Sequence, residues 1–101
     1  MRFRETVVFS RWISALRDPQ AKAHILRRLA RAAIGNFGDT RPVGDGISEM
    51  RIDVGAGYRV YYSRHGKVVY VLLCGGNKKS QARDIAAVKR LWAELKGNAL
   101  K

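Results

Sequence analysis

The sequence is short of acidic residues and of cysteine. Eight Asp and Glu stand against twenty Lys and Arg in 101 residues, which gives a formal net charge of +12. This excess predicts a polyanionic partner, such as nucleic acid, an acidic membrane surface or an acidic protein. A basic surface without a partner is disfavoured, because self-repulsion destabilises a fold unless something neutralises it. The single cysteine, Cys74, excludes a disulfide framework and is typical of a reducing compartment.

Long apolar runs and metal-ligand clusters are missing as well. No stretch has the ~20 apolar residues that span a bilayer, and the N-terminus has no apolar segment long enough for a signal peptide. We therefore expect a cytoplasmic protein that does not contact a membrane. His24 and His65 lie far apart and no Cys/His cluster accompanies them, so we expect neither metal nor cofactor. Neither a G-x-S-x-G motif nor a phosphate-binding glycine loop is present.

What is present suffices for one domain covering residues 1–101. The pattern predicts an α+β domain with the order strand, helix, helix, three strands and helix, its helices packed against a small antiparallel sheet. A polar, turn-rich loop is expected at residues 36–46. We expect strands at residues 6–9, 47–54, 58–63 and 67–74, and helices that begin at Ser10, cover residues 20–34 and cover residues 80–96.

The segment EMRIDVGAGYRVYYSRHG, residues 49–66, predicts two strands that face each other around Gly-Ala-Gly. Alternation along both strands predicts one buried face, made by Met50, Ile52, Val54, Tyr58, Val60 and Tyr62. The opposite face carries Arg51, Arg59 and Tyr61, and we expect Tyr61 to be exposed there.

Further basic side chains, Lys78 and Lys79, follow the last strand. Arginine offers planar donors that match a phosphate, lysine adds a point charge, and tyrosine stacks on a base or transfers a proton. Together with Arg51, Arg59 and Tyr61, this set suits the scissile phosphate of single-stranded RNA. The alternative is a solvent-facing strand whose arginines form weak salt bridges with acidic neighbours. The basic residues of the second helix are expected to form a solvated face.

Two motifs resemble the toxins of the RelE/ParE superfamily, and more narrowly the HigB-like branch of addiction module killer proteins. The first is E-M-R-I-x-x-G-x-G-Y-R-V-Y-Y at residues 49–62, and the second is V-L-L-C-G-G-N-K-K-S-Q-x-R-D-I at residues 71–85. The segments W-x-x-x-L-x-D, from Trp12, and L-W-x-x-L, from Leu91, fit as well. The resemblance covers nearly the whole chain, from about residue 6 to residue 97.

The resemblance implies a metal-independent mRNA endoribonuclease that acts on the translating ribosome. In such enzymes the ribose 2′-OH attacks the adjacent phosphate and leaves a 2′,3′-cyclic phosphate and a 5′-OH. Arg59 corresponds to the arginine that contacts the scissile phosphate, while Arg51, Lys78 and Lys79 share the stabilisation of charge and Tyr61 stacks or transfers a proton. Further contacts to RNA are expected from Gln81, Arg83 and Arg64. The implied partners are the ribosome, mRNA and a helix-turn-helix antitoxin, through which operator DNA is bound.

Relatives carry a His or Tyr near the start of the last helix or at the very C-terminus. This sequence departs from them, because it has Ser80, Gln81 and Ala82 at the first place and ends in Gly97-Asn98-Ala99-Leu100-Lys101. The general base therefore stays open between a lysine, a tyrosine, Glu49 and Asp53; in a further alternative, positioning and electrostatics do most of the work and the ribosome completes the site. The alternative function is that of a ParE-like inhibitor of DNA gyrase without ribonuclease activity, and a third is a catalytically silent RNA-binding module.

Overall fold

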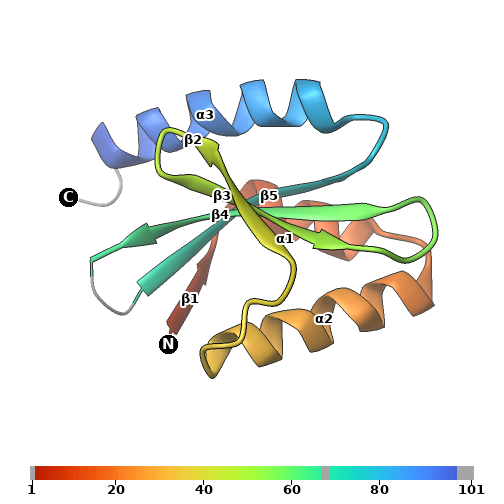
Figure 1. Cartoon of the computed structure of the whole chain (residues 1–101). Coiled ribbons are helices and arrows are strands. Elements are labelled where there is room, and N and C mark those ends of the chain that lie inside the picture. Colours follow the sequence, from red (N-terminus) through yellow and green to blue (C-terminus); the bar gives the residue numbers. More distant parts are fainter. Residues whose placement is uncertain (1, 67–68, 98–101) are drawn as a thin grey trace.

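The computed structural model describes residues 2–66 and 69–97, and it has the expected α+β architecture. One sheet has the strand order β1-β5-β4-β3-β2. Helix α3 covers one face of this sheet, and α1 and α2 cover the other (Figure 1). The elements in chain order are β1 (Arg2–Glu5), α1 (Val7–Ala15), α2 (Pro19–Ala33), β2 (Thr40–Gly44), β3 (Ile47–Ile52), β4 (Tyr58–His65), β5 (Val69–Asn77) and α3 (Gln81–Gly97).

The chain's first strand and first helix differ from the sequence prediction. Residues 6–9 were expected as a strand, but the strand is Arg2–Glu5 and the helix begins at Val7. Thr6 caps this helix by accepting a hydrogen bond from the Phe9 N–H, and its hydroxyl donates to the Leu73 carbonyl at 2.7 Å. The β-branched run Thr6-Val7-Val8 suggested a strand, but the cap and the packing of Phe9 override that weak propensity.

The sheet is mixed rather than purely antiparallel. The pairs β2–β3, β3–β4 and β4–β5 are antiparallel, whereas β1 pairs with β5 in parallel. The expected loop at residues 36–46 contains β2, an edge strand with Pro42 inside it. Proline is tolerated there because an edge strand forms a ladder on one side only. Of the expected strand 67–74, Lys67 and Val68 lie outside the described residues, and β5 continues to Asn77.

Two apolar clusters fill the space on either side of the sheet. Under α1 and α2 lie the expected buried residues of the hairpin, Met50, Ile52, Val60 and Tyr62, with Val54 and Tyr58 half-buried at the margin. Under α3 lie Val71, Leu73 and Tyr61, packed against Val88 and Trp92. The hairpin's polar face is therefore covered over part of its length by a helix, and only one end of it stays open.

Candidate functional site

A hollow of about 280 Å³ opens where the β3–β4 hairpin meets the end of β5. Three basic side chains line it, and each comes from a different segment. Arg51 on β3 and Arg59 on β4 are partners in the strand register, and Lys78 follows β5 directly. The remaining lining residues are Asp39, Ile52, Asp53 and Gly57. The expected convergence of Arg51, Arg59 and Lys78 is therefore present.

Arg51 is held at the rim of the hollow by the loop that precedes β2. Its Nη2 lies 3.4 Å from Asp39 Oδ1, and its backbone N–H donates to the Asp39 carbonyl at 2.9 Å. Arg28 of α2 donates to the carbonyl of Arg51 at 2.8 Å and to those of Phe37 and Asp39 at 3.2 and 3.4 Å. Arg28, expected on a solvated helix face, instead ties this loop to β3.

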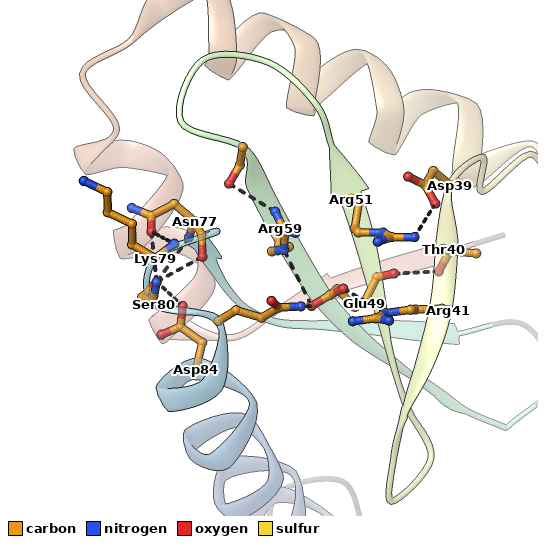
Figure 2. Close-up of polar contacts among 12 residues, drawn as sticks. Asp39, Thr40, Arg41, Glu49, Arg51, Arg59, Asn77, Lys79, Ser80 and Asp84 are labelled. Atoms are coloured by element: carbon orange, nitrogen blue, oxygen red, sulfur yellow. Dashed lines mark hydrogen bonds and ion pairs between the residues drawn. The ribbon is translucent and has the colours of Figure 1, made fainter.

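Arg59 is the least exposed cation of the hollow, with only 9% of its surface accessible. Its Nη1 donates to the Gly57 carbonyl at 3.3 Å, and its Nε lies 3.8 Å from Oε2 of Glu49 (Figure 2). Glu49 itself is fully buried, and its two oxygens also contact Arg41 and Gln81. The sequence left Glu49 open as a candidate general base or, in the alternative interpretation, as a partner in a weak surface salt bridge, and neither requires it to be buried. The signal in the sequence for a role of Glu49 near the hollow was its position two residues before Arg51, because residues i and i+2 of a strand lie on the same face of the sheet.

Lys78 is brought to the hollow by a compact turn between β5 and α3. Its N–H donates to the Gly57 carbonyl at 2.7 Å, which joins the turn to the tip of the hairpin. The Asn77 side chain accepts hydrogen bonds from the N–H groups of Lys79 and Ser80 at 2.9 and 3.1 Å. These hydrogen bonds within the turn fix the backbone position of Lys78, while the Lys78 side chain is exposed.

Lys79 does not join the hollow. Figure 2 shows its side chain extending away from Arg59, and it lines a second, more open depression of about 310 Å³ together with Arg83, Asn77 and Ser80. Two consecutive residues line the two depressions, Lys78 the first and Lys79 the second. Lys79 and Arg83 therefore extend the basic surface beyond the hollow.

Tyr61 is not exposed, contrary to the sequence prediction. Its accessible surface is 0%, because α3 covers this part of the sheet. Its hydroxyl makes no hydrogen bond within the described part of the chain. Burial raises the pKa of Tyr61 above its ordinary value, and the neighbouring Glu49 carboxylate raises it further. A buried phenol with a raised pKa neither stacks on a base at the surface nor serves as a base near neutral pH.

Gln81 and Arg64 also lie apart from the hollow. Gln81 turns inward and donates from Nε2 to Oε2 of Glu49 at 2.8 Å. Arg64 lies toward the other end of β4, beside an aromatic hollow lined by Phe37, Tyr62 and Tyr70. Among residues 2–66 and 69–97, no group of His, Cys, Asp and Glu side chains is arranged to hold a metal ion. Within those same ranges no helix has the length and apolar character to cross a membrane.

The chain matches no model of a known protein family. It is 46% identical over 95 residues to an uncharacterized protein of Haemophilus influenzae. The match covers 94% of this chain and 96% of that protein, so the similarity extends over nearly the full length of both. The chain therefore belongs to the same protein family as this Haemophilus influenzae protein.

Proposed function

We propose that the protein is the toxin of a type II toxin–antitoxin pair and that it cleaves mRNA on the translating ribosome. The observation that carries the proposal is the convergence of Arg51, Arg59 and Lys78 on one hollow. Among the lining residues these three cations stand against the two carboxylates of Asp39 and Asp53, an excess of one positive charge in the lining, while Glu49 behind it also pairs with Arg41. One phosphodiester neutralises that excess, and arginine and lysine are the donors that phosphate oxygens prefer.

In the proposed reaction the ribose 2′-oxygen attacks the adjacent phosphorus. The P–O2′ bond forms and the P–O5′ bond breaks, which leaves a 2′,3′-cyclic phosphate and a 5′-hydroxyl. Arg51 and Arg59 stabilise the negative charge that builds up on the pentacoordinate phosphate. Lys78 donates a proton to the departing 5′-oxygen.

Asp53 is the general base in this scheme and takes the proton of the 2′-hydroxyl. It lines the hollow and is exposed, and its side chain forms no ion pair within residues 2–66 and 69–97. The other carboxylates are less suitable, because Asp39 is bound to Arg51 and Glu49 is buried among its own partners. A free carboxylate at the rim reaches a ribose that a buried one does not.

The sequence supports the same function independently. The two motifs that resemble RelE/ParE toxins supply all three cations of the hollow, and the net charge of +12 suits RNA and the ribosome. A toxin with this target acts in the cytoplasm. Its helix-turn-helix antitoxin is expected to cover the basic surface with an acidic segment and to carry the complex to operator DNA.

The test is induction of the protein in cells, followed by mapping of mRNA 5′ ends. Cuts inside translated codons are expected with the wild type, and Arg59→Ala should reduce them about 100-fold or more, the scale of losing one transition-state donor. Arg90→Ala is the matched control, because this exposed arginine of α3 does not line the hollow. Intact messages together with double-strand DNA breaks would overturn the proposal in favour of gyrase inhibition.

A further inference from the structure

The buried carboxylate of Glu49 sits behind the hollow and contacts one of its cations. Glu49 Oε1 lies 3.3 Å from Nε of Arg41 on β2, and Oε2 accepts a hydrogen bond from Gln81 of α3 at 2.8 Å. The same Oε2 lies 3.8 Å from Nε of Arg59. Figure 2 shows Glu49 between Arg41 on one side and Arg59 on the other. One carboxylate thus joins β2, β4 and α3 while it stays outside the lining of the hollow.

Stability alone does not account for a charge in this position. A carboxylate with 0% accessible surface loses its hydration, and a buried ion pair often stabilises a fold no better than apolar residues of similar volume. The pair with Arg41 is weak support, since half of the Arg41 side chain is exposed to water. The contact that distinguishes Glu49 is therefore the one to Arg59, whose guanidinium is itself nearly buried.

We infer that Glu49 is a positioning residue for Arg59, and that it sets the orientation in which the guanidinium meets the scissile phosphate. This inference rests on the proposed ribonuclease function. The Arg59 guanidinium lies between the Glu49 carboxylate, whose Oε2 is 3.8 Å from Nε without a hydrogen bond to it, and the Gly57 carbonyl, which accepts a hydrogen bond from Nη1 at 3.3 Å. The hydrogen bond to Gly57 and the charge attraction of Glu49 limit its rotation, and Arg59 already lines the hollow before RNA arrives. Such preorganisation lowers the reorganisation needed in the transition state.

A counter-charge behind Arg59 also has an opposite effect on ground-state binding. The Glu49 carboxylate compensates the Arg59 charge while the hollow is empty, and it then competes with the phosphate for the same cation. Removal of the negative charge should therefore leave RNA binding equal or tighter and make cleavage slower. A residue that only maintains the fold does not separate binding from cleavage in this way.

The experiment uses Glu49→Gln, which keeps the size of the side chain and an oxygen that accepts from Gln81. Single-turnover cleavage of a message on programmed ribosomes should slow by about 10- to 100-fold, the scale of a misplaced catalytic group. Affinity for the same ribosomes, carrying a message with a 2′-deoxy residue at the scissile position, should stay equal or rise. Arg41→Ala is the matched control, because it removes the other ion pair of Glu49 and should change cleavage less than about threefold.

A double-mutant cycle that combines Glu49→Gln with Arg59→Lys tests whether Glu49 affects cleavage through Arg59 or through a general effect on the fold. Lysine keeps the charge but lacks the Nε that faces Glu49, so Glu49→Gln should have little further effect in that background. Additive losses would overturn the inference, as would wild-type cleavage by a folded Glu49→Gln protein. If Glu49→Gln does not fold, Glu49→Asp replaces it, and unchanged cleavage by that variant would overturn the inference. Absence of cleavage by the wild-type protein would overturn the proposed function and this inference with it.

Discussion

Replacement of Gly75 by alanine should force a methyl group into the indole ring of Trp12. A Cβ built on Gly75 would lie 2.2 Å from Cε3, 2.3 Å from Cζ3 and 2.4 Å from Cδ2 of that ring. Carbon atoms in good contact are ~3.5–4.0 Å apart, so the ring has to retreat by more than an ångström. Trp12 is partly buried against the cluster under α1, and its ring lies against Phe9 and Tyr58 with centroids 5.9 and 6.4 Å away, so the ring cannot shift without disturbing these contacts.

The size of the effect follows from the rigidity of the obstructing group. Overpacking of a well-filled core costs about 1–3 kcal/mol, and we expect the upper half of that range because an aromatic ring on a helix cannot deform. For a domain of this size each kcal/mol lowers the melting temperature by roughly 4–8 °C. Gly75→Ala should therefore melt about 10–20 °C below the wild type.

The assay is thermal and urea unfolding followed by circular dichroism. Gly97→Ala is the matched control, because a Cβ at Gly97 meets nothing within 4 Å, and it should be neutral or stabilising by up to ~1 kcal/mol. Trp12→Leu should recover part of the loss when combined with Gly75→Ala, since it removes the atoms that clash. A melting temperature of Gly75→Ala within about 2 °C of the wild type would refute the steric argument.

Two further perturbations test other parts of the structure. Burial raises the pKa of the Cys74 thiol to about 12, against ~8.5 for an exposed thiol. Between these two pH values the unfolded chain loses a proton that the folded chain retains. The free energy of unfolding is therefore unaffected by this thiol below pH ~8.5 and decreases as the pH rises toward 12. Cys74→Ala should flatten the fall of the melting temperature between pH 8.5 and 10.5, and parallel curves would contradict this. Arg28→Ala removes the donors to the carbonyls of Arg51, Phe37 and Asp39 and should cost about 1.5–3 kcal/mol. Amide exchange at residues 36–39 should speed up in Arg28→Ala and stay unchanged in the exposed control Arg31→Ala, and equal protection in both variants would count against the role of Arg28.

Alternation along residues 49–62 was sufficient to predict the hairpin and its apolar face. A period of two assigns Met50, Ile52, Val60 and Tyr62 to one side, and all four are buried there. The same period groups Arg51 and Arg59, so their approach to Lys78 at the end of the hairpin could be anticipated. These features depend on the alternation of side chains along a strand, which can be read directly from the order of residues in the sequence.

The covering of the opposite face could not be read from that pattern. Period-two alternation says which residues share a face, but it does not say how far a helix from residues 81–97 extends over it. Tyr61 and Glu49 lie under α3 and are buried, whereas Arg51, on the same face of the sheet, lines the open hollow. Similarly, residues 2–5 are mostly charged, and only their pairing with β5 makes them a strand.

The pairing of β1 with β5 makes assembly of this domain a late event during synthesis. The Thr6 hydroxyl bonds to the carbonyl of a residue 67 positions further along the chain, so the N-terminal strand has no partner until most of the polypeptide exists. Lys78 follows the end of that partner strand, and α3, which buries Glu49, comes later still. A nascent chain that stops before β5 therefore lacks both the second neighbour of β4 and one of the three cations of the hollow. Interrupted translation should accordingly yield fragments in which the hollow never forms.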